Sequence, residues 1–481
     1  MFVGTGSDVG KSVINAAFCR IFKQDGLNPA PFKAQNMSLN SFPTPDGLEI
    51  GRAQAVQAEA CGIPCSVEMN PVLLKPTGDM DSQIVLNGKP WANKSAKAYF
   101  DGTDRDFLFA EAMKSFDRLE AKFNPVVIEG AGSISEVNLW DRDITNMRVA
   151  VEKNADTYLV ADIDKGGVFA SVYGTIMLLP EEEKRLIKGI IINKFRGDIS
   201  LFETGREKLK ELCGVPVVGV IPYFRDIYVD DEDSVVVDKK QFNAISGKTN
   251  IAVVLLRHMS NFTDFNMLEQ LPGVNLYYAA TPEDFKDADI IILPGSKNTI
   301  SDMLYLRKRG MVAEIIRAHQ SGKAVYGICG GYQMMGLEIS DPDQVEGDVG
   351  SVPGLGLLPV KTILTSEKTT EQCSFTFGKE NLKGQGYEIH MGETSSENMQ
   401  ALCEIEGGKK DGYFLNERTW GTYIHGIFDN AEIVNSILAE NGKEAIAEID
   451  FQQFKDQQYD KLAALVRDNV DMDYIYKTLI K

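Results

Sequence analysis

The feature that most constrains this chain is a series of short β-branched segments, each followed by Gly, Asp or Asn. In the first half these segments are MFV (1–3), NPVVIEG (124–130), TYLVADI (157–163), KGIIINK (188–194) and VPVVGVIP (215–222). Strands of a parallel sheet that is covered on both faces read as continuous apolar runs joined by crossover helices. The first half of the chain is therefore predicted to fold as an α/β domain with a parallel sheet.

A second pattern of the same kind begins near the middle of the chain. Its runs are NIAVVLL (250–256), NLYYAA (275–280), DIIILPGS (289–296) and AVYGIC (324–329). The later glycine-rich stretch fits a mixed sheet, and the C-terminal stretch has helical periodicity. The sequence thus predicts a first domain over 1–228, an acidic and polar linker over 229–249, a second domain over 250–435 and a C-terminal helical segment over 436–481.

Length and charge narrow the class of protein. The chain has 481 residues, more than one ordinary domain at roughly 100–200 residues per domain. Its net charge of −19 argues against nucleic acid as a partner, because phosphate binding needs an excess of Lys and Arg. No apolar run approaches the ~18–20 residues that span a bilayer, and the first residues lack a signal-peptide pattern. We expect a cytoplasmic enzyme with no membrane partner, and the composition carries no signal for an oligomeric state.

The segment GTGSDVGKS (4–12) has the character of a phosphate-binding loop. Backbone N–H groups of a Gly-rich turn and the N-terminus of the following helix form a site for phosphate. We expect the loop, with Gly4, Thr5 and Gly10, to bind ATP, with Lys11 at the β- and γ-phosphates and the Ser12 hydroxyl on Mg²⁺. The usual spacing would place a glycine where Thr5 stands, so a Gly-rich turn with an incidental lysine is the alternative. The longer spacing resembles the dethiobiotin-synthetase group of P-loop enzymes.

Acidic side chains at the ends of other apolar runs are candidates for the Mg²⁺ shell, because this ion prefers oxygen ligands. Glu129, in VVIEGAGS, is the leading candidate. Other carboxylates with similar contexts are Asp141, Asp143, Asp162 and Asp164. Asn193, in IIINKFRGD, is a candidate for contact with the nucleotide base.

The segment VYGICGGYQMMG (325–336) passes from an apolar run into a helical stretch through Gly-Ile-Cys-Gly-Gly. The form G-x-C-x-G matches a nucleophile elbow, a strained strand-to-helix turn that exposes the nucleophile. Cys329 is therefore the predicted nucleophile, and a helix N-terminus would favour its thiolate. The predicted oxyanion donors are the N–H of Gly330 and the turn at Gly295. A buried core cysteine is the alternative, but the glycines around Cys329 argue against it.

The base that a nucleophilic cysteine needs is predicted to be His425. It lies in WGTYIHGIFDN, after a β-branched and aromatic run and before a glycine. Catalytic partners of a cysteine are close in space and distant in sequence. His390, in GYEIHMGE, is the rival candidate.

Together these motifs resemble those of the cobyric acid synthases, the glutamine-hydrolysing amidotransferases of cobalamin biosynthesis. The elbow, TYIHG, LPGSKNT and the phosphate loop all match that family's pattern. Further matching stretches are PFKAQNMSLNS (31–41), GRAQAVQAEA (51–60), MNPVLLKP (69–76), ADIDKGGVFASVYGT (161–175), INKFRGD (192–198) and HMSNFTDFN (258–266). The resemblance implies a P-loop, dethiobiotin-synthetase-like parallel sheet domain followed by a class I glutamine amidotransferase-like, flavodoxin-like α/β domain.

The resemblance also implies a reaction and a set of ligands. ATP, with Mg²⁺, would activate the b, d, e and g carboxylates of adenosylcobyrinic acid a,c-diamide, and ammonia from L-glutamine would convert them to amides. Cys329 and His425 carry over as the catalytic pair. The usual third member, two residues after the histidine, is replaced by Ile427, which predicts a dyad. Glu388 is a weak candidate for orienting the imidazole.

Three basic residues in the family-like stretches, Lys33, Arg52 and Lys75, are candidates for binding the corrinoid carboxylates, with surface salt bridges as the alternative. Ammonia has to be kept from water, so a closed passage between the domains is expected. Two alternative hypotheses remain. One is an amidotransferase of the same architecture, such as cobyrinic acid a,c-diamide synthase, and the other is a P-loop binding or regulatory protein with an inactive amidotransferase half.

Overall fold

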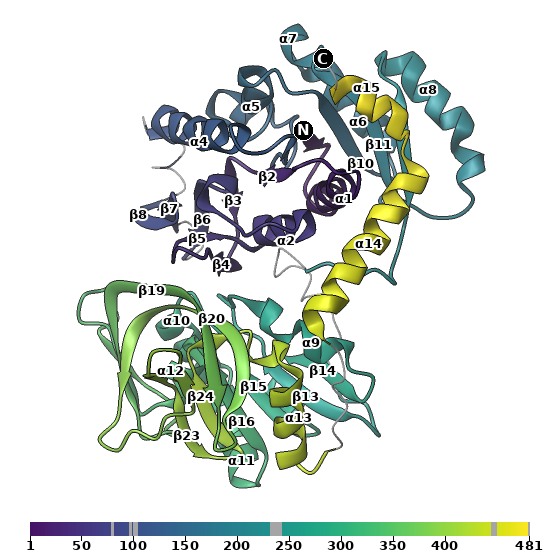
Figure 1. Ribbon diagram of the computed structural model, residues 1–481. Helices are drawn as coiled ribbons and strands as arrows, with labels where there is room; N and C mark the ends of the chain where they lie inside the picture. The colour runs from purple at the N-terminus through teal and green to yellow at the C-terminus, as the bar shows by residue number, and fades with distance from the viewer. Residues whose placement is uncertain (78–80, 96–98, 100–103, 231–242, 444–449, 480–481) are drawn as a thin grey trace.

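The computed structural model describes residues 1–77, 81–95, 99, 104–230, 243–443 and 450–479. Figure 1 shows two α/β domains, one above the other, and helix α14 (Phe451–Asn469) running from the lower domain to the upper one. The linker expected over 229–249 includes residues 231–242, which lie outside the described residues.

The first domain is built on a parallel sheet in which all five predicted strands are present. Strands β1, β10, β11 and β12 pair in that order, and a bridge between Phe2 and Glu129 joins them to the parallel pair β9 and β2. Side chains alternate between the faces: Tyr158 packs towards α1 and α14, and Leu159 towards the other face. The strands are β1 (Phe2–Gly4), β2 (Ala30–Phe32), β9 (Val126–Ile128), β10 (Thr157–Asp162), β11 (Ile187–Phe195) and β12 (Val217–Pro222). The helices are α1 (Lys11–Gln24), α2 (Arg52–Cys61), α4 (Asp104–Glu120), α5 (Met147–Glu152), α6 (Val168–Leu178), α7 (Glu181–Lys184) and α8 (Glu203–Cys213).

Small strands of the first domain form the side that faces the second domain (Figure 1). One sheet has the order β3-β6-β7-β8, and β4 pairs with β5. These strands are β3 (Gln35–Met37), β4 (Ser41–Pro43), β5 (Glu49–Gly51), β6 (Val72–Pro76), β7 (Asp81–Leu86) and β8 (Lys89–Ser95). Two of their residues meet the second domain: Ser41 N donates to Oδ1 of Asn261, and Lys75 lines a cavity together with side chains of that domain.

The second domain has a central sheet of order β14-β13-β15-β16-β24-β23, parallel except for β23. Its first five strands follow the flavodoxin-like order, in which sites form at the carboxyl ends of the strands. The strands are β13 (Thr249–Val254), β14 (Val274–Ala279), β15 (Ile290–Leu293), β16 (Ala324–Ile328), β23 (Tyr413–Asn416) and β24 (Thr419–Thr422). The helices are α9 (Asn266–Gln270), α10 (Thr299–Lys308), α11 (Met311–Gln320), α12 (Gly330–Met335) and α13 (Ala431–Glu440).

A second, mixed sheet covers the catalytic side of this domain, as the glycine-rich stretch predicted. Its order is β18-β17-β19-β20-β25, with β21 on β19 and β22 on β21. Its strands are β17 (Glu338–Ser340), β18 (Ser351–Pro353), β19 (Lys361–Phe377), β20 (Leu382–Ser395), β21 (Cys403–Ile405), β22 (Lys409–Asp411) and β25 (Ile424–His425).

The C-terminal helices return to the first domain. Helix α14 packs on α1, where Leu462 and Val466 join an apolar cluster with Phe18. Arg20, largely buried, binds Asp460 at 2.7 Å. Helix α15 (Met472–Leu479) continues along the same domain. The chain therefore crosses between the two domains twice.

Replacing Leu462 by alanine is expected to lower the free energy of unfolding by about 2–5 kcal/mol, because this buried side chain fills the contact between α14 and α1. Chemical denaturation followed by circular dichroism measures the loss. Lys461→Ala, at an exposed position of the same helix, is the matched control and should change stability by less than about 0.5 kcal/mol. Equal effects of the two substitutions would contradict the packing of α14.

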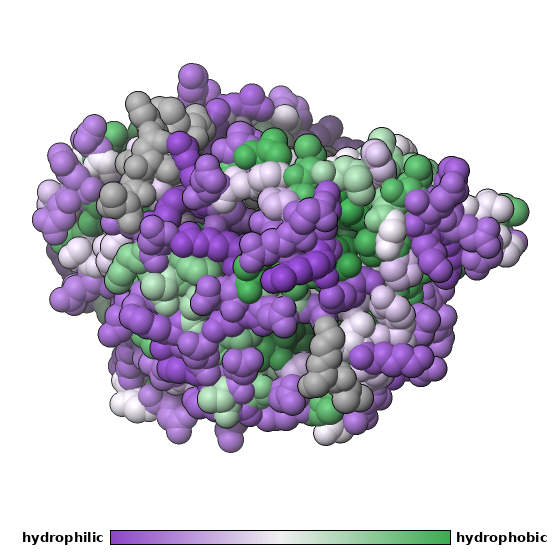
Figure 2. Space-filling model, turned by 90° about the horizontal axis from the view of Figure 1, so that it is seen from above, coloured by the Kyte–Doolittle hydropathy of each residue, from purple (hydrophilic) through white to green (hydrophobic). Residues whose placement is uncertain are grey.

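The surface agrees with the polar composition. Figure 2 shows polar and charged side chains over most of the face seen from above, interrupted by smaller apolar areas. Exposed apolar side chains include Tyr173 and Leu178 of α6. Among the described residues, none of the helices has the length and apolar character to span a membrane.

Candidate active site

Cys329 occupies a strained turn between β16 and α12. Its backbone angles are φ 51° and ψ −110°, in a region that residues other than glycine rarely adopt. The two following glycines are required by close packing: a Cβ on Gly330 would lie 2.8 Å from the Ser296 nitrogen, and one on Gly331 would lie 2.0 Å from the Leu293 oxygen. The structure therefore forms the elbow that the sequence predicted at this position.

His425 lies beside Cys329 and is oriented by a carboxylate that the sequence reasoning missed. Its Nδ1 is 2.7 Å from Oδ2 of Asp264, which lies in the short 3₁₀ helix η5 (Phe262–Phe265). The other carboxylate oxygen accepts the Gly426 N–H at 3.1 Å. Both side chains are almost fully buried, and Tyr387 stacks on the imidazole with the ring centres 5.2 Å apart. Asp264 thus has the position of the third member of a Cys–His–Asp triad.

The expected dyad is wrong. Ile427 does occupy the slot two residues after the histidine, but it is a core side chain, and the carboxylate comes from a segment 161 residues earlier. Glu388 does not orient His425. It binds Lys409 at 2.6 Å and lies 3.5 Å from Nε2 of the rival candidate, His390.

The charges around His425 favour its protonated form. Burial alone would lower the pKa of the imidazole, but the charges of Asp264 and Cys329, and hydrogen bonds with both, raise the pKa of His425 to about 10. An imidazolium beside a cysteine stabilises the thiolate. The site therefore holds a proton on His425 that is available to a departing nitrogen.

Two backbone N–H groups that could stabilise an oxyanion, those of Gly330 and Ser296, lie where β15 ends against the elbow. Met259 and Ser296 form an antiparallel bridge that is flanked by hydrogen bonds from Ser260 N to the Gly295 oxygen, at 3.0 Å, and from Lys297 N to the His258 oxygen, at 2.9 Å. In such a pair the N–H of Ser296 points away from its partner strand, towards Gly330. This geometry favours Ser296 over the predicted Gly295 as the second donor beside Gly330. Gly295 has another role, since a Cβ there would lie 3.3 Å from Cε1 of His425.

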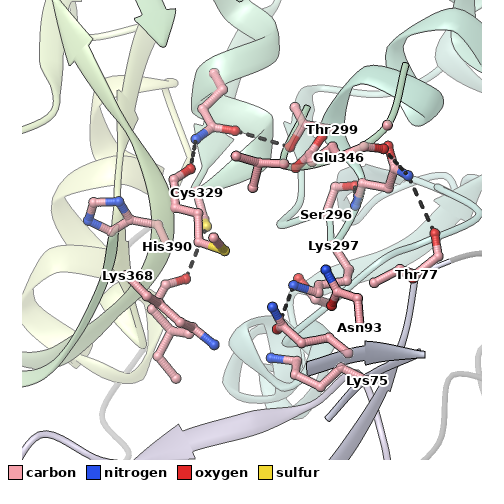
Figure 3. A pocket seen from close by; sticks show the side chains of 18 of the residues that line it. Lys75, Thr77, Asn93, Ser296, Lys297, Thr299, Cys329, Glu346, Lys368 and His390 are labelled. Carbon is pink, nitrogen blue, oxygen red and sulfur yellow. Dashed lines mark hydrogen bonds between the residues drawn. The ribbon is translucent and has the colours of Figure 1, made fainter. Parts of the chain in front are cut away.

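Cys329 opens into a cavity of about 340 Å³ that both domains line (Figure 3). The second domain contributes Ser296, Lys297 and Glu346, and the first domain contributes Lys75 and Gln83. His390 also lines the cavity, but it stacks on Tyr423 and its Nδ1 lies 3.2 Å from the Gly392 oxygen. The nucleophile therefore faces the first domain.

The phosphate loop opens into a second cavity, of about 800 Å³, at the start of α1. Gly10 has φ 100°, and a Cβ there would lie 2.1 Å from Nδ2 of Asn193, so this position requires glycine. Lys11 Nζ donates to the carbonyl oxygens of Gly6 and Gly132, each at 2.9 Å. The lysine is thus folded over the loop, where phosphate oxygens would replace these carbonyls.

Two of the predicted loop residues support the backbone. A Cβ on Gly4 would lie 2.9 Å from the Gly6 oxygen, so any side chain at this position would clash with the backbone of the turn. Thr5 N donates to the Val160 oxygen at 3.1 Å, which fixes the loop on the sheet. Asn193 donates to the Val9 oxygen at 2.9 Å and holds the loop from the neighbouring strand. Its contact with a nucleotide base stays a prediction.

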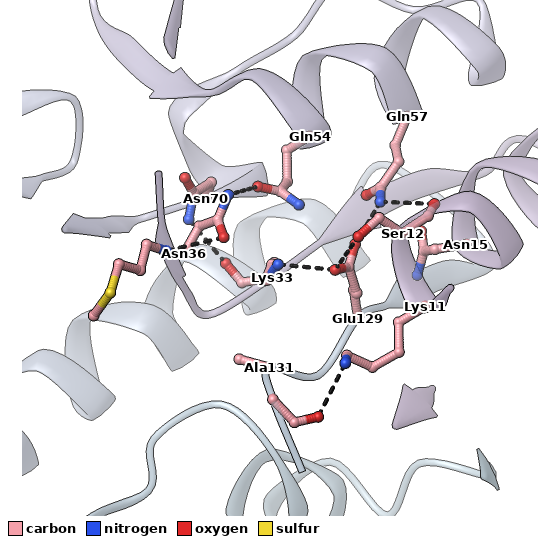
Figure 4. A network of polar contacts seen from close by, with 12 residues as sticks. Lys11, Ser12, Asn15, Lys33, Asn36, Gln54, Gln57, Asn70, Glu129 and Ala131 are labelled. Atoms are coloured by element: carbon pink, nitrogen blue, oxygen red, sulfur yellow. Dashed lines mark hydrogen bonds and ion pairs between the residues drawn. The ribbon is translucent and has the colours of Figure 1, made fainter. Parts of the chain in front are cut away.

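Ser12 and Glu129, the two predicted Mg²⁺ ligands, lie together in Figure 4. Ser12 Oγ donates to Oε1 of Glu129 at 2.8 Å, and this fully buried carboxylate also accepts bonds from Lys33 Nζ at 2.8 Å and Gln57 Nε2 at 2.5 Å. Paired oxygen donors beside a phosphate loop fit Mg²⁺, which keeps waters and phosphates as its other ligands.

The four aspartates weighed beside Glu129 lie outside the lining of this cavity. Asp143 accepts the Thr145 N–H at 2.8 Å, and Asp162 binds Lys194 at 2.9 Å. Asp164 pairs with Arg196, and Asp141 is exposed. Among the described residues there is also no group of three His, Cys, Asp or Glu that could hold a metal ion. Glu129 is therefore the carboxylate of the five that the fold places at the phosphate loop.

Comparison with known proteins places both sites in one family. The CobQ/CobB/MinD/ParA nucleotide binding domain matches residues 1–234, and the CobB/CobQ-like glutamine amidotransferase domain matches residues 250–433. Cobyric acid synthase of Parabacteroides distasonis is 59% identical, with 100% of this chain and 98% of that protein covered. This chain belongs to the cobyric acid synthase family. The relatives from Bacteroides fragilis and Caldanaerobacter subterraneus subsp. tengcongensis are 56% and 45% identical, each over 100% of this chain and 98% of its own length.

Family membership confirms two expectations from the sequence. The chain has a nucleotide-binding domain followed by a glutamine amidotransferase domain, and it is an amidotransferase of the ligase type with glutamine as the amide donor. Within this cobyric acid synthase fold, Asp264 lies in the HMSNFTDFN stretch that the resemblance had singled out. An aspartate in this family-like stretch was the one sequence feature that pointed to the third member of the triad.

The three basic residues proposed for the corrinoid are all buried and paired. Lys33 binds Glu129, Arg52 binds Asp230 at 2.7 Å, and Lys75 binds Glu49 at 2.6 Å. They line three different cavities: Lys33 the phosphate-loop cavity, Arg52 a cavity of about 610 Å³ between the domains, and Lys75 the Cys329 cavity. The structure does not bring them together into one binding surface.

Proposed function

We propose that this chain converts the b, d, e and g carboxylates of adenosylcobyrinic acid a,c-diamide to amides, using ATP for activation and glutamine as the nitrogen donor. The observation that carries the proposal is the Cys329 cavity, because side chains of the nucleotide-binding domain form part of its wall. A glutaminase that served no second reaction would have no need of that wall.

The glutaminase half follows from the triad. The Cys329 thiolate attacks the side-chain carbonyl of glutamine, and the N–H groups of Gly330 and Ser296 stabilise the resulting oxyanion. His425 gives its proton to the nitrogen as the C–N bond breaks, which leaves ammonia and a glutamyl thioester. Asp264 holds the imidazole, and water then hydrolyses the thioester to glutamate and restores Cys329.

The synthetase half follows from the phosphate loop. Lys11 binds the phosphates, and a carboxylate oxygen of the corrinoid attacks the γ-phosphorus to give an acyl phosphate and ADP. Mg²⁺ held by Ser12 and Glu129 would neutralise phosphate charge. Ammonia then attacks the acyl carbon, a proton is lost to solvent, and phosphate leaves as the amide forms.

Replacing Lys11 by methionine tests the assignment of the two halves. Amide formation is expected to fall at least about a hundred-fold with either glutamine or ammonium chloride as donor, because the loss removes transition-state stabilisation at the phosphates. Glutamate release should continue, since the triad is intact. Liquid chromatography of glutamate and of the corrinoid product measures both. Normal amidation by Lys11→Met would contradict the role given to the loop.

A further inference from the structure

The Cys329 cavity and the phosphate-loop cavity share one wall. At the end of β6, Lys75 lines the first cavity and Pro76 lines the second. Successive side chains of a strand point to opposite faces, which explains this division. In the second domain, Asn261 lines the Cys329 cavity and its neighbour Phe262 lines the phosphate-loop cavity. At this place a single layer of residues therefore separates the Cys329 cavity from the phosphate-loop cavity.

The wall is held by a reciprocal pair of side-chain hydrogen bonds between the domains. Ser41 N donates to Oδ1 of Asn261 at 3.2 Å, and Phe262 N donates to Oδ1 of Asn40 at 3.2 Å. Lys75 Nζ donates to the Ser41 hydroxyl at 2.9 Å. Asn40, Ser41, Asn261 and Phe262 are each at most 3% exposed. The two bonds between the domains each need one side chain, the Lys75 bond joins two side chains, and none of the three belongs to a helix or sheet ladder. Opening the wall would therefore not require a secondary-structure element to unfold.

Three lysines, Lys75, Lys297 and Lys368, line the Cys329 cavity on this side of the wall, and the carboxylates of Asp81 and Glu346 line it with them. Glu49 pairs with both Lys75 and Lys368, and Lys297 Nζ donates to Gln83 Oε1 at 3.0 Å. Figure 3 shows Lys75 and Lys297 on the part of the cavity opposite Cys329. Burial, together with the charges of Lys368 and Lys75, lowers the pKa of Lys297 to about 7. An ammonium ion in the same surroundings would meet the same penalty, and would therefore tend to release its proton.

We propose that the wall formed by Asn40, Ser41, Asn261 and Phe262 is the gate through which ammonia passes from the Cys329 cavity to the phosphate-loop cavity, and that Lys75, Lys297 and Lys368 restrict the passage to the uncharged molecule. The inference rests on the proposed function. It assigns a place and a residue set to the closed passage that an ammonia-transferring enzyme requires. Two stretches singled out in the sequence, FKAQNMSLNS and SNFTDFN, thereby receive a shared role.

The test is to fill the gate at Ser41, which is buried in the wall and lines neither cavity. Three rates are measured in Ser41→Leu: glutamate release, amidation with glutamine, and amidation with ammonium chloride, which reaches the nucleotide cavity from solvent. Amidation with glutamine should fall at least about ten-fold, while the other two rates stay within about three-fold of the parent. Ser41→Ala, which adds no volume, is the matched control and should keep amidation and glutamate release in the parental ratio.

Either of two results would overturn the gate. In one, Ser41→Leu keeps the parental ratio of amide to glutamate. In the other, amidation falls equally with both donors, which would place Ser41 in the synthetase site. Ser41→Val, a smaller plug, keeps the test available where the leucine variant does not fold, and should give an intermediate ratio. The failure of the parent protein to amidate with either donor would instead contradict the proposed function.

An isotope-competition experiment in the unaltered protein is a second test of the gate. With glutamine labelled at the amide ¹⁵N and an excess of unlabelled ammonium chloride, the amide product should carry mainly ¹⁵N. Product labelling that follows the bulk ratio of the two nitrogen sources would mean that ammonia escapes before reaching the acyl phosphate, and would overturn the gate.

Discussion

Cys329→Ala is expected to lower the rate of glutamate release at least about a thousand-fold, because no second thiol lines the cavity among the described residues. Glutamine-dependent amidation should fall by the same factor. Cys329 is buried at the N-terminus of α12, and alanine is smaller than cysteine, so the substitution should leave the fold in place. Steady-state release of glutamate from glutamine measures the effect.

Amidation supported by ammonium chloride is the internal control for this variant. It should stay within about three-fold of the parent, because the phosphate loop and Glu129 are untouched. Cys403→Ala, at a buried cysteine on β21, is the matched variant and should keep glutaminase activity. Glutamate release by Cys329→Ala at the parental rate would contradict the nucleophile assignment.

Asp264→Asn is expected to lower kcat for glutamine hydrolysis by up to about ten-thousand-fold, because an amide in place of the triad acid favours the wrong imidazole tautomer. The side chain keeps its shape, so the contact with Gly426 N through Oδ1 is preserved. Glu388→Gln is the control. It changes a carboxylate on β20, the strand that pairs with β25 of His425, and this carboxylate binds Lys409. Here kcat should stay within about ten-fold of the parent.

The pH dependence separates catalysis from a structural role. Hydrolysis should fall as the pH rises through the pKa of His425, about 10, because the proton for the leaving ammonia is then lost. Asp264 contributes most to raising this pKa, so its removal should lower the pKa and move the falling limb to lower pH. A reduced kcat with an unmoved limb would indicate that Asp264 only stabilises the fold.

The strands and the two motifs could be predicted because they depend on local chemistry. Continuous β-branched runs leave little choice but a buried parallel strand, and the glycines around Cys329 are dictated by contacts such as that of Gly331 with the Leu293 oxygen. The pairing of Ser12 with Glu129 follows from the rule that parallel strands end at one edge of a sheet. Each of these inferences needs only neighbouring residues or one general rule.

The carboxylate of the triad could not be predicted in the same way. The expected position, two residues after the histidine, is a local spacing, and Ile427 there gave no hint of a replacement. Asp264 lies in the 3₁₀ helix η5, which follows β13, whereas His425 is on β25. Contacts of Asn261 and Phe262 with the first domain hold η5 in the position from which Asp264 reaches His425. The packing of α14 on α1 could not be predicted either, because the periodicity of a helix shows which face is apolar but not which element that face contacts.

Under the proposed function, ammonia made at Cys329 is used at the phosphate loop to amidate a corrinoid. The most direct test of this proposal is the mass spectrum of adenosylcobyrinic acid a,c-diamide after incubation with the protein, ATP and amide-¹⁵N glutamine. We expect four successive replacements of a hydroxyl by a ¹⁵N-labelled amino group, with no labelled product when ATP is omitted. A corrinoid of unchanged mass, in a reaction that nevertheless releases glutamate, would contradict it.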